Sequence, residues 1–227
     1  MKNSRTVVLA RCRAAAAAAV AALLVAGCAS TSTTTTPDDD DARLARMMAG
    51  SFRDEGIAKI DRLQQDGANA ACSQAQGGTP PEDVAGAIRQ AALASVRLPA
   101  DGKFIGDWRE GEKLAQNGRG MTWTDKSAAT AANGGNCYNC HQISPAEIAF
   151  GTLGPSLYRY GKSRGITDPD SAAARPVVEY TWTKLWNAKA FNACSGMPRF
   201  GHGGLLDERQ LKDLMALILD PKSVANQ

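Results

Sequence analysis

Two cysteines and a histidine stand in one short run, Cys137-Tyr138-Asn139-Cys140-His141. Thiols at this spacing can each form a thioether with a vinyl group of the same porphyrin, and the adjacent imidazole can then bind the iron. A redox dithiol or half of a zinc site also uses Cys-x-x-Cys, but neither needs the histidine that follows. Zinc would also need ligands from scattered residues, namely Cys72, Cys194 and His202. Because the run occurs once, the sequence predicts one covalently bound haem c.

The first 27 residues have the composition of an export signal. A basic start precedes a small apolar run, residues 14–27, which is too short and too rich in alanine for a comfortable membrane span. The run ends in Leu-Val-Ala-Gly before Cys28 and resembles a bacterial lipoprotein processing site. That resemblance implies cleavage before Cys28, its acylation, and a periplasmic protein anchored to a membrane, which we expect to be the outer one. An ordinary cleaved signal is the alternative.

Removal of the signal changes the charge of the chain. The full sequence has 26 Lys and Arg residues and 23 Asp and Glu residues, and four of the basic residues lie within 1–27. The mature chain therefore has 22 basic and 23 acidic residues, a net charge of −1. This balance gives no electrostatic reason to expect nucleic acid binding.

Composition divides the chain into four segments. After the signal (1–27), residues 28–41 have no apolar side chain large enough to build a core, so we expect a disordered tether. Apolar residues spaced by three and four predict a helix from Ala42 to about Gln65. The run Thr79-Pro80-Pro81-Glu82 predicts the start of another helix, with Thr79 as its N-cap and proline at its first position. We expect this helix to end near Val96. These helices form an N-terminal extension, 42–101, ahead of a haem domain, 102–227.

Helices are also expected in the haem domain. Asp107 and Glu110 have the spacing of a capping box, and Gly111 in that helix marks either a close helix contact or a tolerated surface glycine. Asp207 and Gln210 predict the start of the last helix. Two apolar helical faces follow from spacing: Val178, Trp182, Leu185 and Trp186, and then Leu211, Leu214, Met215 and Ile218. No strand alternation is convincing, so the predicted class is all-α with long loops.

The segments after the haem motif resemble class I cytochromes c. In that family the carbonyl of a proline in a Gly-Pro-x-Leu run holds the proximal histidine, which implies this role for Pro155; an ordinary turn proline is the alternative. The family places a methionine followed by proline in a loop of the C-terminal half, which implies that Met197 is the second axial ligand. His202 is its rival. A thioether ligand would keep the iron closed and suit electron transfer.

Five runs together resemble the SoxX family, the monohaem subunits of the SoxAX cytochromes of bacterial thiosulfate oxidation. They are Gly-Met-Thr-Trp at 120–123, Gly-Asn-Cys-Tyr-Asn-Cys-His at 135–141, Gly-Thr-Leu-Gly-Pro-Ser-Leu at 151–157, Met-Pro-Arg-Phe-Gly at 197–201 and Leu-Ile-Leu-Asp-Pro at 217–221. The resemblance covers roughly 107–221. It implies a cytochrome c-like haem domain in which Cys137 and Cys140 hold the haem, with His141 and Met197 as axial ligands.

The resemblance also implies an activity and partners. The chain would accept electrons as the non-catalytic subunit of a heterodimeric L-cysteine S-thiosulfotransferase, which couples thiosulfate to a carrier-protein cysteine. Its partners would be a SoxA-type dihaem or monohaem cytochrome subunit, a transient SoxYZ-type carrier and a soluble cytochrome c. The sequence has one haem motif, so it is not expected to perform the sulfur chemistry alone.

The lipoprotein site, the tether and the extension depart from a freely soluble SoxX. The extension could pack on the haem domain or on the partner. In an oxidising compartment the two remaining cysteines, Cys72 and Cys194, are candidates for a disulfide, which would join the extension to the loop of Met197. Two other functions stay open: a general lipid-anchored periplasmic electron carrier for another oxidoreductase, and a haem-based sensor or peroxidase with an open sixth position.

Overall fold

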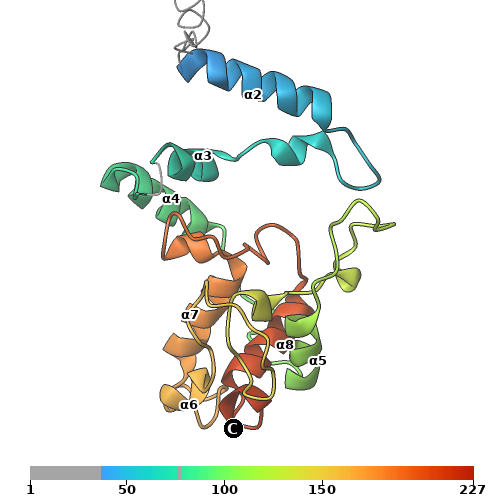
Figure 1. Ribbon diagram of the computed structural model, residues 1–227. Helices are drawn as coiled ribbons and strands as arrows, with labels where there is room; N and C mark the ends of the chain where they lie inside the picture. The colour runs from blue at the N-terminus through green and yellow to red at the C-terminus, as the bar shows by residue number, and fades with distance from the viewer. Residues whose placement is uncertain (1–36, 76–77) are drawn as a thin grey trace, which may run out of the picture. The chain divides into compact units, whose positions relative to one another are not determined.

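The computed structural model describes residues 37–75 and 78–227 (Figure 1). Regular structure in these residues is helical, and their only β pairing is an isolated bridge between Glu55 and Ala58. The all-α prediction is therefore confirmed. The chain separates into two compact units, the second of which comprises Arg53–Gln227. Cys28 and the export signal lie outside the described residues, and none of the described helices has the length and apolarity needed to cross a membrane.

Helix α2 (Pro37–Ser51) belongs to the first unit and overturns two predicted boundaries. It begins inside the segment predicted to be a tether up to Asp41, because the aspartates 39–41 lie in its first turns, where the helix dipole favours negative charge. The helix predicted to reach Gln65 ends at Ser51 instead. Beyond it the chain turns at Gly56, whose φ of 56° favours glycine, and only the 3-10 turn η2 (Ile60–Leu63) follows.

The rest of the extension packs on residues 102–227. It contains α3 (Gly67–Gln74) and α4 (Glu82–Ala94), and α4 lies against the short turn η5 (Ala188–Ala190) that follows α7 (Figure 1). The indole N–H groups of Trp182 and Trp186 donate to the carbonyl oxygens of Arg97 and Ser95, at 2.8 and 2.9 Å. Helix α4 matches its predicted range closely, but Pro81 stands at its N-cap and no side chain caps it, so the predicted Thr79 cap is wrong.

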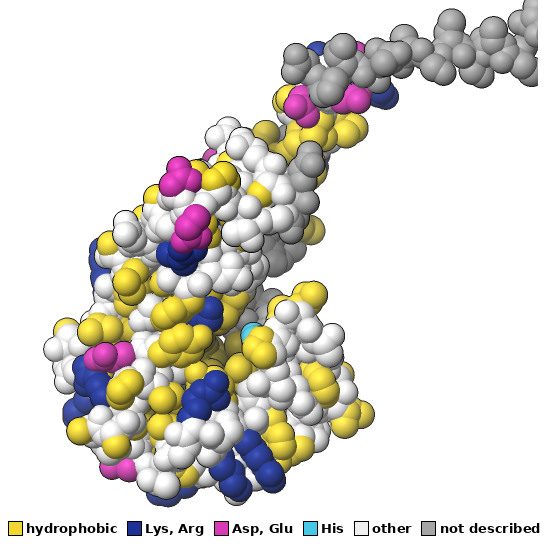
Figure 2. Space-filling view, turned by 90° about the vertical axis from the view of Figure 1, so that its left-hand side faces the viewer, with side chains coloured by type: hydrophobic (Ala, Val, Ile, Leu, Met, Phe, Trp, Pro, Cys, Tyr) yellow, Lys and Arg dark blue, Asp and Glu magenta, His cyan; other side chains and the backbone are white. Residues whose placement is uncertain are grey.

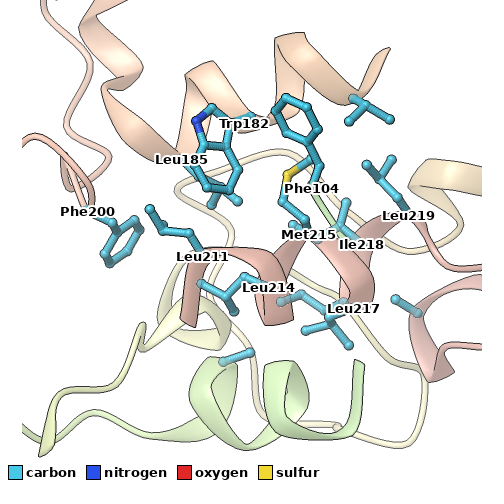
Figure 3. Close-up of a cluster of buried hydrophobic side chains, with 14 of the residues drawn as sticks. Phe104, Trp182, Leu185, Phe200, Leu211, Leu214, Met215, Leu217, Ile218 and Leu219 are labelled. Atoms are coloured by element: carbon cyan, nitrogen blue, oxygen red, sulfur yellow. The ribbon is translucent and has the colours of Figure 1, made fainter. Parts of the chain in front are cut away.

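Four helices enclose the core of residues 102–227, the segment predicted to be the haem domain. They are α5 (Trp108–Gln116), α6 (Tyr160–Ser163), α7 (Arg175–Trp186) and α8 (Glu208–Leu219). Helix α8 contacts each of the other three, most extensively α5, and its apolar side chains fill the centre of the cluster in Figure 3. The predicted stripe of α8 is buried, as are Leu217 and Leu219, because neighbours surround the helix. Val178, Trp182 and Leu185 of α7 are buried as predicted.

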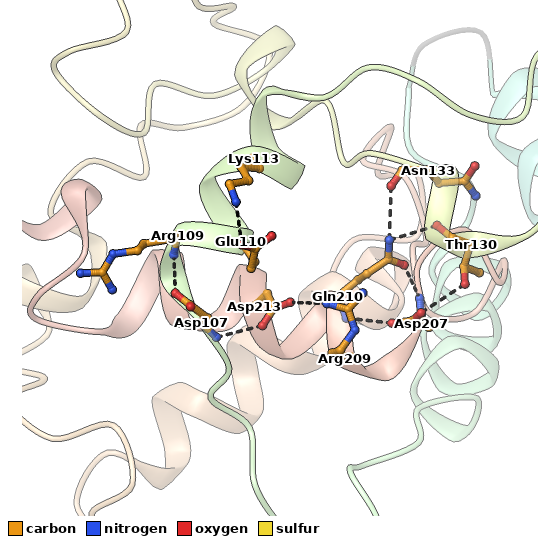
Figure 4. Close-up of polar contacts among 10 residues, drawn as sticks. All are labelled: Asp107, Arg109, Glu110, Lys113, Thr130, Asn133, Asp207, Arg209, Gln210 and Asp213. Atoms are coloured by element: carbon orange, nitrogen blue, oxygen red, sulfur yellow. Dashed lines mark hydrogen bonds and ion pairs between the residues drawn. The ribbon is translucent and has the colours of Figure 1, made fainter.

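The crossing of α5 and α8 is close enough to require a glycine. A Cβ atom at Gly111 would lie 2.1 Å from the carbonyl oxygen of Asp213 on α8. The first alternative for Gly111, a close helix contact, is therefore correct. The side chain of Asp213 reaches across the same crossing, where its Oδ1 accepts from the backbone N–H of Asp107 at 2.8 Å (Figure 4).

The starts of these two helices differ from each other. The helix start predicted from Asp207 and Gln210 is confirmed, and the two residues form a capping box. The Gln210 amide also donates to the carbonyl oxygen of Thr130 at 3.0 Å (Figure 4). Asp107 caps α5 by accepting from the N–H of Arg109, but Glu110 does not complete a box. Glu110 forms an ion pair with Lys113 at 2.7 Å instead, so the predicted capping box of α5 is wrong.

Candidate haem site

The haem motif is anchored to the end of α5. It forms one 3-10 turn, η4 (Cys137–Asn139), and Asn136 before it adopts the left-handed conformation with φ 49°. The backbone N–H groups of Gly135 and Asn136 donate to the carbonyl oxygens of Leu114 and Asn117, at 2.8 and 3.0 Å. These bonds satisfy carbonyl groups at the end of the helix that have no partner within it. The core crossing of α5 and α8 therefore fixes the position of the motif.

A second segment, 151–157, runs alongside the motif. The backbone N–H of Gly151 donates to the carbonyl oxygen of Tyr138 at 2.7 Å. The backbone N–H of Gly154 donates to the carbonyl oxygen of Cys140 at 2.8 Å. A Cβ atom at Gly151 would lie 1.8 Å from the carbonyl oxygen of Asn139, so only glycine allows this approach. The Gly-rich run singled out in the sequence thus has a structural task, which is to hold the backbone of the motif.

The same segment orients the histidine. The carbonyl oxygen of Pro155 lies 2.7 Å from Nδ1 of His141, and the imidazole lies against Gly154, where a Cβ atom would be 2.1 Å from Cε1. This contact places the ring proton on Nδ1, since a carbonyl can only accept a hydrogen bond. Nε2 is then the nitrogen with a free lone pair, which is the state a metal ligand needs.

The two motif cysteines are free thiols, whereas the other described cysteines form a disulfide. Burial, with a smaller contribution from Cys140, raises the pKa of the Cys137 thiol to about 12. A dithiol enzyme instead needs a thiolate with a lowered pKa. No three His, Cys, Asp or Glu side chains within 37–75 and 78–227 are grouped so that they could hold a metal ion.

Met197 and His202 lie in different surroundings. Met197 is half-buried and packs against the hydrophobic core, as Cys137 does. His202 is exposed and lines a pocket of about 350 Å³ with Ala87 and Ile88 of α4. Of the two candidate second ligands, Met197 is therefore the one that shares a core with the haem motif. Met197 and His141 share no hydrogen bond in the described part of the chain.

The loop of Met197 is tied to α3. Cys72 and Cys194 form a disulfide with Sγ atoms 2.05 Å apart and Cα atoms 5.5 Å apart. Arg199 forms an ion pair with Asp66, the N-cap residue of α3. Sequence reasoning paired the cysteines but missed the ion pair, because nothing in the local sequence of Asp66 indicates a partner more than a hundred residues away.

Sequence reasoning also missed a polar contact beside the motif. The hydroxyl of Tyr138 donates to Oε1 of Glu112 on α5 at 2.8 Å, while Oε2 is buried and accepts no hydrogen bond from a described residue. Burial raises the pKa of Glu112, and the negative charge of Glu147 adds to the shift. Nothing in the local sequence of Glu112 indicated this contact.

The residues present fit a haem c group. The donor set is two adjacent thiols and an imidazole with Nδ1 already bonded. Large apolar side chains also lie at the surface on the segment that follows the motif: Ile148 is 91% exposed and Leu153 is 90% exposed. A flat apolar porphyrin would cover such surface. Figure 2 shows hydrophobic side chains at the surface of the larger unit, with Lys and Arg side chains gathered toward the bottom of the view.

Comparison with known proteins gives one informative relative. No protein-family model matches the chain. The chain is 37% identical over 149 residues to an uncharacterized lipoprotein of Aquifex aeolicus (strain VF5). The matched stretch covers 64% of this chain and 64% of that protein, so the chain spans slightly less than two thirds of the relative's length.

Proposed function

We propose that the chain is an exported, lipid-anchored monohaem c-type cytochrome that transfers electrons as a SoxX-like subunit. The main observation behind this proposal is the contact between His141 and Pro155. It engages Nδ1 of the imidazole and leaves Nε2, beside two free thiols, as the nitrogen available to bind iron. A redox dithiol would not require a histidine oriented in this way.

Each residue of the site has a distinct task under this proposal. Cys137 and Cys140 hold the porphyrin through thioethers, while Nε2 of His141 and the thioether of Met197 bind the iron. When bound, the haem supplies reversible one-electron transfer. Pro155 fixes the imidazole through Nδ1, and the backbone of 151–157 fixes the motif. Two protein ligands leave no open position on the iron, which argues against the sensor and peroxidase alternatives.

The SoxX-like assignment rests on the five sequence runs and on the tasks that the structure gives two of them. A single haem motif implies that the sulfur chemistry of an L-cysteine S-thiosulfotransferase belongs to a SoxA-type partner. In that arrangement the present chain accepts the electrons released when thiosulfate is coupled to a SoxYZ-type carrier, and passes them to a soluble cytochrome c. A general electron carrier for another oxidoreductase is the second candidate, because the haem site itself would be the same.

The lipid anchor rests on the sequence that ends at Cys28 and on the lipoprotein name of the Aquifex relative. Acylation at more than one position would give stable membrane attachment, since each buried methylene contributes about 0.8 kcal/mol and one chain is marginal. We place the protein in the periplasm, attached to the outer membrane.

Isolation of the native protein separates the two candidate functions. We expect solubilised membranes to yield this chain together with a second haem protein. Addition of thiosulfate and the carrier protein should then reduce the haem of this chain. As a matched control, a chain with Cys137→Ser and Cys140→Ser cannot hold the haem covalently, so no haem of this chain should be reduced. If the apoprotein folds, this variant should still keep its partner. A haem that purifies alone and ignores thiosulfate with carrier would favour the general carrier instead.

A further inference from the structure

One residue on each side of Met197 is attached to the same helix. Cys194, three residues before Met197, is bonded to Cys72 within α3. Arg199, two residues after Met197, is paired with Asp66 at the N-cap of α3. The two ends of this short helix therefore hold both sides of the methionine. We call these four residues, Asp66, Cys72, Cys194 and Arg199, the α3 clamp.

Further contacts make the base of the clamp rigid. The ammonium group of Lys189 is buried and donates to the carbonyl oxygen of Ala193 at 2.9 Å, directly before Cys194. The amide of Asn187 donates to the hydroxyl of Ser95 at 3.1 Å, and η5 packs on α4. The segment leading into the Met197 loop is thus held by the extension at Asn187 and η5. Met197 itself packs against the core, and its N–H donates locally to Ser195 Oγ at 3.3 Å.

We infer that the α3 clamp is the positioning device for the second axial ligand: it keeps Met197 on the iron and excludes external ligands. This inference rests on the proposed function in that it takes Met197 as the ligand. A methionine binds iron through one weak bond, so an external ligand enters when the loop moves away. Anchors on both sides lower the population of that open loop, because local opening then requires either moving α3 or breaking a bond. The extension would accordingly act on the haem site and not only serve as a spacer behind the lipid anchor.

Two variants weaken the clamp at different ends and keep the rest of the fold. Asp66→Asn removes the charge that pairs with Arg199, yet asparagine is as good an N-cap residue as aspartate, so α3 stays capped at Asn69. Cys72→Ser with Cys194→Ser removes the covalent bond without leaving a single reactive thiol. Asp101→Asn is the matched control, since it breaks an ion pair between the extension and Lys212 of α8 that does not involve the 194–199 loop.

The experiment measures imidazole binding to the oxidised, haem-loaded full chain, together with the long-wavelength absorption band of methionine bound to ferric iron. At saturating imidazole the rate reports the opening of the loop. We expect the double serine variant to bind at least about tenfold faster than the unaltered chain, since removing a disulfide typically costs more than the 1.4 kcal/mol that a factor of ten represents. Asp66→Asn should bind a few-fold faster, because a partly exposed ion pair contributes less, and Asp101→Asn should be unchanged.

The outcomes separate this inference from the proposed function. An unaltered chain with haem but no methionine–iron band would refute Met197 as the ligand, and the proposed role of the α3 clamp would fall with it. A band that is present, with imidazole rates equal in all variants, would refute the clamp and leave the proposed function standing. Arg199→Lys, which keeps a positive charge opposite Asp66 and leaves the N-cap of α3 intact, should keep the slow rate; a rate as fast as that of Asp66→Asn would show that the ion pair does not hold the loop. Equal thermal stability of Asp66→Asn and Asp101→Asn would exclude a general loss of structure as the cause.

Discussion

The carbonyl oxygen of Pro155 accepts a hydrogen bond from Nδ1 of His141 at 2.7 Å, across 14 residues of sequence. The backbone of the Gly-rich run 151–157 makes this contact possible. It forms hydrogen bonds with the backbone of the haem motif at Tyr138 and Cys140, and with that of Gln142, the residue after the motif. The proximal side of the site is therefore built from two segments that are close in sequence and held by α5.

Gly154→Ala should disturb the histidine. The new methyl group would lie 2.1 Å from Cε1 of His141, so the ring must turn away from Pro155. We expect a haem spectrum with weakened low-spin character and a lower yield of mature protein. Gly67→Ala is a suitable control, because a Cβ atom there meets nothing within 4 Å. Normal spectra for both variants would mean that the ring has room to spare.

Gly111→Ala should destabilise the core that α5 and α8 build. Its Cβ would approach the carbonyl oxygen of Asp213 to 2.1 Å, so α5 and α8 would have to separate. Overpacking of this kind costs about 1–3 kcal/mol in free energy of unfolding, measurable by urea denaturation. Gly86→Ala in α4 has only ordinary contacts and should be neutral or slightly stabilising, since alanine is the better helix former. Equal losses in both variants would contradict a special role for the α5–α8 crossing.

Met197→Ala should lower the reduction potential and allow carbon monoxide or imidazole to bind the iron readily, because a thioether ligand favours the ferrous state. His202→Ala should leave potential and spectrum unchanged, since that side chain is exposed beside α4. Potentiometric titration of both variants checks the expectation. The opposite pattern would make His202 the ligand.

Glu112 should make stability depend on pH. Burial raises its pKa above the ordinary value of about 4.5, so between these two values the folded chain binds more protons than the unfolded one. The free energy of unfolding therefore decreases as the pH rises from about 4.5 through the raised pKa. Glu112→Gln, which can still accept from Tyr138, should flatten this part of the profile. An unchanged slope in urea denaturation across that range would show that the carboxyl is solvated.

Cys28→Ser should release the protein from membranes. The variant cannot be acylated at this position, so fractionation should find it in the soluble periplasmic fraction. The unaltered protein should stay with the outer membrane through high-salt and carbonate washes, because acyl chains and not charges hold it. Retention of the serine variant after these washes would mean that another part of the chain binds the membrane.

The elements that could be predicted from the sequence are those set by local rules. Apolar spacing identified α7 and α8, and the capping box of α8 is present because Asp207 and Gln210 are neighbours on the first turn. The boundary of α2 was missed because helix periodicity continues past Ser51, whereas the turn at Gly56 interrupts the backbone. Periodicity describes side-chain faces and gives little information on backbone breaks.

The site could be predicted in part for a similar reason. The cysteines, His141 and Pro155 are neighbours along the chain, so short motifs described them. The pairs Asp66–Arg199 and Tyr138–Glu112 join distant segments, and they depend on how α3 and α5 pack against the rest of the unit. Such contacts follow from tertiary structure, which single-sequence reasoning does not supply.

The most direct test of the central claim is the mass of the mature protein, produced in a bacterium that matures c-type cytochromes, after complete denaturation. We predict a mass that exceeds that of the processed polypeptide by one haem, with the red colour remaining on the chain after acid–acetone extraction, because two thioethers hold the group. Serine at both 137 and 140 should remove the mass increment and the colour together. A colourless protein at the polypeptide mass, or a haem lost on extraction, would contradict the account.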